Sequence, residues 1–338
     1  MTGAPASWDD SAVRSPNGHV LQSTSWASIR EAQGWTAEYV RIGDPLPIAL
    51  VLWRELPVLG RMGYCPRGPI AARGDADGLT HALETLAALA RERDAVLLKV
   101  DPELVAADAA GALAHAGYVR GPDIQPVLAT LAFDLAPDAD ALMAGLEKDT
   151  RWSVRQADKR GVTVRAVSDE SSLRAFYELY RVTGERAHFI TRTWDYYALV
   201  WRTLIGAGLA TLRLAYVDER AVAGAMTWQC GDRELYMYGA SNDQGRKAYA
   251  SYGLQWACIV GAKERGAARY DLGGIPLDPT RRDDPMYGPY LFKKGFGGRA
   301  IAYVGAHDTV PRPLRYRAFR WGEPLFTGAQ RMLGRIAR

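Results

Sequence analysis

One helix-to-strand pattern occurs twice in this chain, and it constrains the fold more than any other feature. Residues 79–93 have the periodicity of an amphipathic helix, and a short apolar strand at residues 95–100 follows and ends in Asp101. About 170 residues later, residues 252–265 repeat the helical pattern and lead into a short strand that carries Asp271. Because each helix must bury its apolar face on a sheet, two α+β halves of similar plan are predicted.

The flanking segments indicate how the halves are organised. β-rich stretches, residues 38–54 and 211–238, precede the two helices, and the second stretch is typical of an antiparallel meander. The polar, proline-containing segment 134–140 is predicted to link the halves. After it, a single helix is predicted to run from Asp140 to Arg160 and to end at the following glycine.

Composition places the chain among soluble globular proteins. Of its 338 residues, 48% are hydrophobic and 24% are charged, which are ordinary values. Its three cysteines are an odd number, so no disulfide framework is implied and a reducing compartment such as the cytoplasm is expected. The first residues lack the basic and apolar regions of a secretory signal, and no apolar run is long enough to span a bilayer.

Positive charge is concentrated near the end of the sequence. The net charge is +4, but the segment from Arg299 onward holds eight arginines and only two acids. Such a basic segment suits a polyanionic partner, namely nucleic acid, anionic lipid or nucleotide phosphates. A solvated arginine-rich helix is the alternative. Leu314, Phe319 and Trp321 are predicted to anchor this segment in a core.

Most signatures of catalysis are missing from the sequence. It contains no G-x-S-x-G elbow, no Walker A loop and no G-x-G-x-x-G fingerprint. The five histidines are scattered, and no cysteine pair has the spacing of a zinc site. We therefore expect neither a metal nor a cofactor.

Four stretches carry side chains suited to binding an anionic substrate. They are LQSTSWASIREAQGW with Arg30 beside Trp26 and Ile29, YCPRGP with Arg67, GERAHFITRTWDYY with Arg192 and Tyr196, and YLFKKGFGG with Phe292 and Lys293. In the last, the glycines predict a flexible bend, and the lysine supplies a mobile positive charge. Each stretch also has a purely structural explanation. Trp26 could belong to the core, Arg67 could cap a turn, Arg192 and Tyr196 could be a surface pair, and the lysines could lie in a solvated hairpin or helix end.

Taken together and in this order, these stretches resemble the Fem family of non-ribosomal peptidyltransferases. The matching segments are QSTSWASIREAQGW, YCPRGP, KDTRWSVRQADKRG, GERAHFITRTWDYY, YDLGG and YLFKKGFGG, and they run from residue 22 to residue 298. FKKGFGG after YDLGG is the most specific element. No sustained heptads occur between Arg160 and Gly298, so the chain resembles the compact members without a coiled-coil arm. Arg30 stands where the family often has lysine.

The resemblance implies a particular fold. Family members consist of two tandem units, each like an acyl-CoA N-acyltransferase (GNAT-like), with a cleft between them. The expected units are residues 1–136 and 137–305, with residues 306–338 returning to pack on the first. This agrees with the repeated helix-to-strand pattern, which was read from the residues alone.

The resemblance also implies a reaction, the transfer of an amino acid from aminoacyl-tRNA to the side-chain amine of a peptidoglycan precursor. The acceptor would be UDP-MurNAc-pentapeptide or lipid II, and the enzyme would be cytoplasmic with peripheral contact at the inner membrane face. A tRNA ester is already activated, so positioning and charge stabilisation are the enzyme's main tasks.

Family residues then carry over to matching positions of this chain. Arg30 and Arg192 would hold the diphosphate, Tyr196 and Tyr238 would line the same cleft, and Arg67 would bind substrate. Phe292 and Lys293 would meet the acceptor end of the tRNA. Asp101 would lie near the stem peptide, where positioning suits it better than proton abstraction, because an ordinary aspartate is too weak a base for an ammonium group.

Two other classes of function remain open at this point. An N-acyltransferase that uses acyl-CoA normally has a glycine-rich turn before its long helix, and residues 244–249 lack those glycines. A nucleic-acid-binding protein without catalytic activity would use the basic segment alone. It would bind RNA but would not transfer any aminoacyl group.

Overall fold

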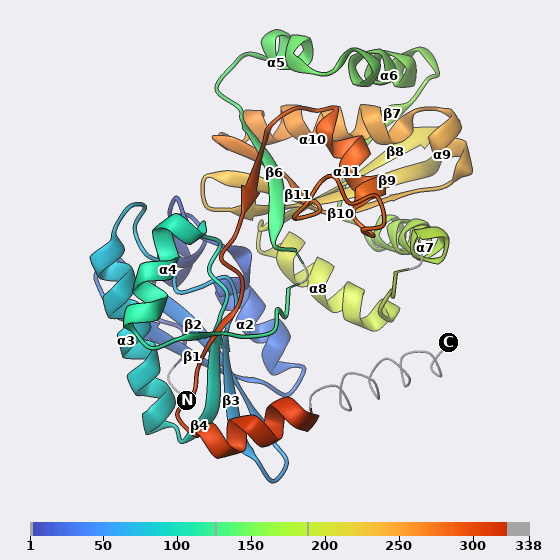
Figure 1. The fold of residues 1–338 in the computed structure, drawn as a ribbon. Coiled ribbons are helices and arrows are strands. Elements are labelled where there is room, and N and C mark those ends of the chain that lie inside the picture. The colour runs from blue at the N-terminus through green and yellow to red at the C-terminus, as the bar shows by residue number, and fades with distance from the viewer. Residues whose placement is uncertain (1–2, 126, 188, 323–338) are drawn as a thin grey trace. The chain divides into compact units, whose positions relative to one another are not determined.

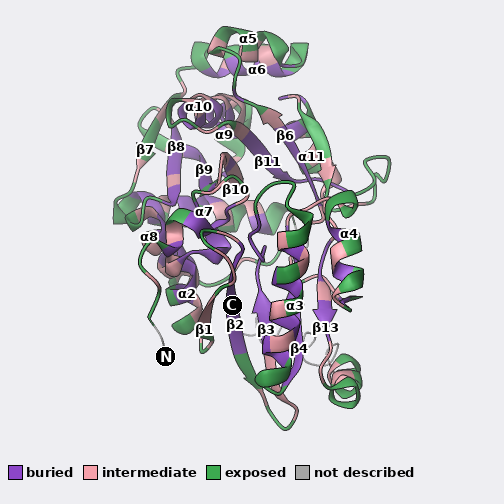
Figure 2. Ribbon diagram, turned by 90° about the vertical axis from the view of Figure 1, so that its left-hand side faces the viewer, coloured by how far each residue is buried: buried purple, intermediate pink, exposed green. Residues whose placement is uncertain are grey.

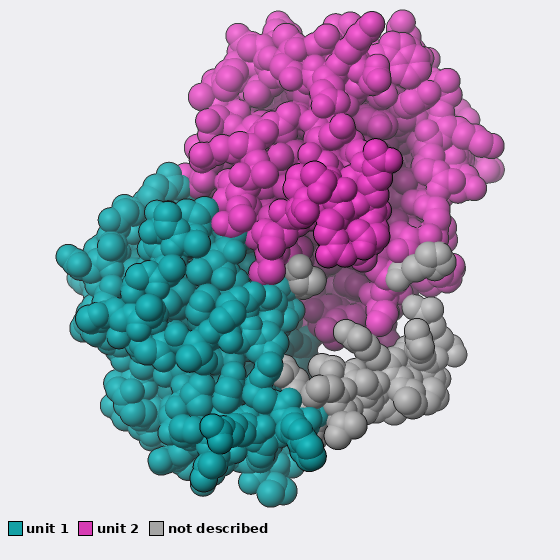
Figure 3. All heavy atoms as spheres, viewed as in Figure 1, with its two compact units in different colours: residues 1–126, 303–338 teal, residues 127–302 magenta. Residues whose placement is uncertain are grey.

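The computed structural model describes residues 3–125, 127–187 and 189–322 of the chain (Figure 1). They form two compact units, which Figure 3 shows in different colours. Unit 1 contains residues up to 126 and the segment that begins at Tyr303, and unit 2 is Val127–Ala302. Each unit has its own mixed sheet with helices, which confirms the predicted α+β class.

Unit 1 is built on a six-stranded sheet of order β1-β2-β3-β4-β13-β5. Its elements are α1 (Trp8–Ala12), the 3₁₀ helix η1 (Val20–Gln22), α2 (Thr24–Glu31), β1 (Thr36–Arg41), β2 (Ile48–Leu56), β3 (Gly60–Cys65), α3 (Ala76–Glu92), β4 (Ala95–Val100), α4 (Ala106–His115), β5 (Val119–Arg120) and β13 (His307–Thr309). A helix at residues 313–322 follows β13.

Unit 2 is built on a seven-stranded sheet of order β12-β6-β11-β10-β9-β8-β7. Its elements are β6 (Ala129–Asp134), α5 (Ala139–Gly145), α6 (Lys148–Lys159), β7 (Thr163–Val167), α7 (Glu170–Ala187), α8 (Trp194–Gly206), β8 (Ala210–Val217), β9 (Arg220–Cys230), β10 (Arg233–Ser241), α9 (Asp243–Lys247), α10 (Ala250–Glu264), β11 (Arg269–Gly274), α11 (Tyr287–Lys294) and β12 (Arg299–Ala302).

The two sheets repeat one plan, as the sequence pattern predicts. In unit 1 the antiparallel run β1-β2-β3 is followed by α3 and by β4, which pairs parallel to β3. In unit 2 the run β8-β9-β10 is followed by α10 and by β11, which pairs parallel to β10. A helical crossover is needed in both places, because parallel neighbours cannot be joined by a tight turn.

Helix α3 shows why these residues fold as they do. The Asp75 side chain caps its first turn by accepting a hydrogen bond from the Gly78 N–H. Leu79, Leu83 and Leu86 recur at helical spacing and are buried in the core of unit 1. Figure 2 shows the result, a helix with a buried side toward the sheet and an exposed outer side.

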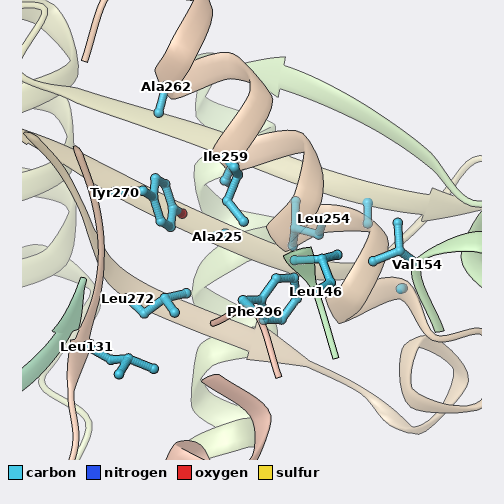
Figure 4. Packing of buried hydrophobic residues seen from close by; sticks show 14 of the residues in the cluster. Leu131, Leu146, Val154, Ala225, Leu254, Ile259, Ala262, Tyr270, Leu272 and Phe296 are labelled. Atoms are coloured by element: carbon cyan, nitrogen blue, oxygen red, sulfur yellow. The ribbon is translucent and has the colours of Figure 1, made fainter. Parts of the chain in front are cut away.

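The core of unit 2 lies between α10 and the sheet (Figure 4). Leu254 and Ile259 of α10 pack with Tyr270 and Leu272 of β11, and all four are buried. Phe296, from the FKKGFGG segment, belongs to the same cluster. This segment is therefore anchored to the core of the unit.

The chain returns to unit 1 after β12, up to residue 322, while the rest of the segment predicted to pack there, residues 323–338, lies outside the described residues. Strand β13 inserts between β4 and β5 and is antiparallel to both. Its Asp308 forms a buried ion pair with Lys99 of β4 at 2.6 Å and accepts a hydrogen bond from the Tyr316 hydroxyl at 2.8 Å. Buried charges need such partners, so the pair fixes the strand in place.

Two local predictions are wrong. The helix expected from Asp140 to Arg160 is broken into α5 and α6, because Leu146 adopts an extended conformation, is buried in the core and ends α5. The core anchors expected near the C-terminus are also incorrect in part, since Leu314 is 80% exposed and Trp321 is 90% exposed. Among the described residues, no helix has the length and apolar character needed to cross a bilayer.

Candidate functional site

Lys293 is a buried cation at the end of α11. Its side chain is 7% exposed, and its Nζ donates a hydrogen bond to the Gly274 carbonyl oxygen at 2.6 Å. Burial lowers the pKa of Lys293 to about 8, although the negative charge of Asp271 opposes this shift. The prediction of a mobile charge is therefore wrong for Lys293, whereas its neighbour Lys294 is exposed.

The carbonyl that binds Lys293 is held by a bend at the end of β11. Asp271 is buried, and its Oδ1 accepts a hydrogen bond from the Gly273 N–H at 2.8 Å. Gly273 has a φ of +72°, and a Cβ there would lie 2.8 Å from the Tyr236 carbonyl oxygen. Only glycine fits this conformation without strain. The bend therefore aims the Gly274 carbonyl at the lysine.

The carboxylate of Asp271 has further partners on neighbouring strands. Its Oδ2 lies 3.2 Å from Nη1 of Arg233 on β10, and Thr130 of β6 donates its hydroxyl to Oδ1. Sequence reasoning missed both Thr130 and Arg233, because they lie far from Asp271 in the chain. Only the pairing of β6 and β10 with β11 brings them together.

Phe292 lies beside the lysine on the same helix and packs with aromatic rings. Its ring centroid is 5.0 Å from that of Tyr252 and 5.3 Å from that of Phe296. Gly295, directly after Lys294, is closely packed, since a Cβ there would lie 1.9 Å from the Thr150 hydroxyl oxygen. Gly295 thus packs against α6, whereas Gly297 and Gly298 form a bend with φ of +86° and +105°.

Arg192 and Tyr196 meet in unit 2 next to a large aromatic cluster. Helix α8 begins at Trp194, so Arg192 precedes the helix, but its guanidinium still lies 4.6 Å from the centre of the Tyr196 ring. The Tyr197 ring contacts both Tyr196 and Tyr238, at 5.4 and 5.9 Å between centroids. Burial raises the pKa of Tyr238 well above its usual range, so its hydroxyl stays protonated.

Asp101 and Arg67 are brought together in unit 1. Asp101 Oδ1 accepts a hydrogen bond from the Arg67 backbone N–H at 2.6 Å, and its Oδ2 accepts one from the Tyr64 hydroxyl at 2.9 Å. Burial raises the pKa of Asp101, and the positive charge of Arg67 works against that shift. The carboxylate is thus engaged in shaping the turn after β3, which suits a positioning role.

The same turn is held from its other side by residues that sequence reasoning missed. Gln22 is fully buried, donates to the Pro66 carbonyl oxygen at 2.6 Å and accepts from the Leu50 N–H at 2.7 Å. Glu103 lies 3.4 Å from Nε of Arg67. The only signal in the sequence was the glutamine that opens the QSTSW stretch. The turn therefore presents Arg67 in a fixed, left-handed backbone conformation, with φ of +53°.

Arg30 occupies the last turn of α2, which Ser23 caps by accepting a hydrogen bond from the Trp26 N–H. Its guanidinium lies 4.8 Å from the centre of the Trp35 ring and donates to Oε1 of Gln33 at 2.5 Å. Trp26 and Ile29 are buried, as their shared helical face predicts. Stacking leaves the edge of a guanidinium able to bind phosphate.

The helix expected to hold a coenzyme A pyrophosphate starts differently here. Tyr249 precedes α10 in a left-handed conformation, and its ring contacts the Arg160 guanidinium at 4.9 Å and the Trp152 ring at 5.2 Å. The segment before α10 therefore carries a tyrosine in ring contacts with two neighbouring side chains, and not the glycine-rich turn that binds a pyrophosphate. This disfavours the acyl-CoA alternative. Among the described residues, no group of three or more potential ligands is placed to hold a metal ion.

Two α+β units of repeated plan define a class of fold that solved structures share. A crystal structure of FemX aligns with 95% of this chain and 98% of its own, with a TM-score of 0.83 and 23% identity. The structure of L-PGS from Bacillus licheniformis aligns with 90% of this chain and 95% of its own, with a TM-score of 0.54 and 12% identity. The predicted two-unit α+β fold is confirmed.

Sequence comparison then gives the family. The FemAB family model matches residues 7–118, 112–221 and 209–322, so the chain belongs to the FemAB family and is a transferase. Lipid II:glycine glycyltransferases from Staphylococcus aureus strains USA300 and NCTC 8325 are each 26% identical, over 96% of this chain and 96% of their own. Their alignments run over 408 residues, so segments of these relatives have no counterpart in this shorter chain.

Proposed function

We propose that this enzyme transfers an amino acid from aminoacyl-tRNA to the side-chain amine of a peptidoglycan precursor and so begins an interpeptide bridge. Membership of the FemAB family and the name of the staphylococcal relatives support a peptidoglycan acceptor. That name favours lipid II over a UDP-linked precursor as the acceptor. The protein would then work at the inner face of the cytoplasmic membrane.

In the proposed step the acceptor nitrogen attacks the carbonyl carbon of the aminoacyl ester. A C–N bond forms, the ester C–O bond breaks, and the ribose hydroxyl of the tRNA leaves with a proton taken from the amine. Negative charge develops on the carbonyl oxygen at the tetrahedral stage. A preorganised positive group in a site shielded from water stabilises such an oxyanion strongly.

The observation that carries this proposal is the buried, hydrogen-bonded ammonium of Lys293. The Gly274 carbonyl and the nearby Asp271 hold it in place, so little reorganisation is needed when charge develops. Beside it, Phe292 supplies a half-buried ring. An aromatic ring can stack on a terminal base of the tRNA acceptor end.

Arg30, Arg67 and Arg192 are assigned to acceptor binding. Arginine donors match the geometry of phosphate oxygens, and the rings of Trp35 and Tyr196 orient two of these guanidinium groups. We expect Arg30→Ala and Arg192→Ala each to weaken acceptor binding by about 1.5–3 kcal/mol. Titration calorimetry with a UDP-linked muropeptide measures this, and unchanged affinity in both variants contradicts the assignment.

The transfer reaction itself is tested with charged tRNA pools and either lipid II or a UDP-linked precursor. Mass spectrometry of the acceptor should show a mass increase of one or more aminoacyl residues. RNase treatment of the donor before the assay should abolish the increase. A mass increase that needs acyl-CoA instead of tRNA would show that the proposed donor is wrong.

A further inference from the structure

One end of unit 1 exposes apolar side chains that the fold does not use. Val58, at the tip of the β2–β3 hairpin, is 104% exposed, and Leu314 and Trp321 of the 313–322 helix are almost as exposed. Figures 1 and 2 both place this hairpin and this helix at the same end of the unit. Exposed large apolar residues that gather in one place mark an interaction surface.

Unlike a helix that packs on a core, this helix turns its large apolar residues outward. Leu314, Arg317 and Trp321 are spaced three and four residues apart, so they share one face, and all three are exposed. Tyr316 faces the other way and donates its hydroxyl to the buried Asp308. Leu314 and Trp321 therefore point to solvent, while the polar contact of Tyr316 attaches the helix to unit 1.

The hairpin tip supports the same conclusion. Val58 has a φ of +69°, a conformation that is unfavourable for a β-branched residue. Because Val58 is fully exposed, it gains no packing energy within the unit. Nothing in the fold of unit 1 explains an apolar residue at this position, whereas an external apolar phase would.

Arginines surround these apolar residues. Arg312 and Arg315 both bind Asp94, at 2.5 and 3.0 Å, and their hydrogen bonds lower the pKa of this aspartate. An Arg315 Nη lies 3.5 Å from the position that a Cβ on Gly60 would occupy, which places the helix beside the hairpin. Arg61 pairs with Glu55, and Arg317 and Arg320 add further positive charge. The surface is therefore net positive.

We propose that this end of unit 1, termed here the docking face (Val58, Leu314, Trp321 and the arginines around them), binds the surface of an anionic lipid bilayer. Tryptophan and leucine inserted at the headgroup boundary, flanked by arginines, are what interfacial helices use. RNA could bind the arginines, but it offers no apolar surface against which Leu314 and Val58 could be buried. The proposal does not depend on the transfer reaction.

Binding of the full-length protein to sedimented vesicles tests the docking face. Vesicles of about 30% phosphatidylglycerol in phosphatidylcholine should bind it, and neutral vesicles should bind it weakly. Arg317→Glu should lower the partition coefficient roughly thirtyfold on anionic vesicles. Trp321→Ser should lower it about tenfold, through lost apolar burial.

Matched controls are available on unit 2, where Leu277 and Arg220 are also exposed. Leu277→Ser and Arg220→Glu should leave vesicle binding unchanged, and melting temperatures should show that all four variants fold. Equal binding to neutral and anionic vesicles would overturn the proposal. So would binding to a tRNA that is lost in Arg317→Glu while vesicles are not bound at all.

Discussion

A buried aspartate lies in or directly after the equivalent strand of each unit, β4 or β11, and the two carboxylates accept hydrogen bonds from different turns. Asp101 follows β4 and accepts a hydrogen bond from the Arg67 N–H of a separate turn. Asp271 lies in β11 and accepts one from Gly273, two residues further along its own strand. In unit 1 the acid thus presents an arginine, and in unit 2 it presents a carbonyl to Lys293. The repeated fold places a buried aspartate at this strand in each unit. The turn that donates a hydrogen bond to it determines which group the aspartate positions.

Burial also affects the ionisable groups of the two units in opposite ways. It raises the pKa of Asp101, so the folded state binds the proton of this acid more tightly than the unfolded chain does. It lowers the pKa of Lys293 from 10.5 to about 8, so the folded state binds that proton less tightly. As pH rises, the ionisation of Asp101 should therefore lower the free energy of unfolding, and the deprotonation of Lys293 should raise it.

The largest expected effect is on catalysis by Lys293→Met. Removing one electrostatic contact to the oxyanion should lower the single-turnover transfer rate about 10²–10³-fold. Acceptor affinity, measured by titration calorimetry, should stay the same, because methionine keeps the length of the side chain. Lys294→Met is the matched control, since Lys294 is exposed on the same turn, and it should transfer at close to the wild-type rate.

A smaller effect is expected on the stability of the same variant. Below about pH 8 the wild-type protein must keep a charged Lys293 buried, which costs about 3 kcal/mol for a shift from 10.5. Relative to wild type, Lys293→Met should therefore gain stability as pH falls from 10.5 to 8, and the gain should level off below 8. Urea unfolding across this range measures the difference. A difference that is independent of pH contradicts the buried charge.

Asp101→Asn should show a trend of opposite sign in the dependence of stability on pH. The raised pKa means that the ionised carboxylate costs stability above its folded pKa, and that this cost disappears below the ordinary value of 3.8. Relative to wild type, the variant should therefore gain stability as pH rises from 3.8. If unfolding experiments show a loss over that interval, the hydrogen bonds from Arg67 and Tyr64 favour the ionised form more than burial opposes it.

The sequence predicts the architecture well because the architecture depends on local periodicity. Strand β4 begins and ends at the predicted residues, and α10 lies within two residues of its prediction. The break at Leu146 was not predictable, because it depends on a distant contact. The Glu147 N–H donates to the Gly295 carbonyl oxygen at 2.9 Å, and this partner belongs to the FKKGFGG segment, almost 150 residues away in the sequence.

The sequence predicts which residues of the candidate site lie near one another, but it does not predict how deeply each of them is buried. Phe292 with Lys293, Arg192 with Tyr196, and Asp101 with Arg67 all lie in contact or next to each other. The burial of Lys293 could not be read from FKKGFGG, since two adjacent lysines look equally exposed in a sequence. Lys293 is buried and Lys294 is exposed because the two residues lie on different faces of α11, and only the face with Lys293 is turned toward the core.

The pH dependence of the ratio between wild-type and Lys293→Met transfer rates tests the central claim most directly. The ratio cancels the ionisation of the acceptor amine, because that amine is the same in both reactions. If the Lys293 ammonium stabilises the oxyanion, the ratio should be constant below about pH 8 and fall about tenfold per unit above it. A ratio that instead rises up to pH 8, or that does not change with pH, would contradict the proposed role.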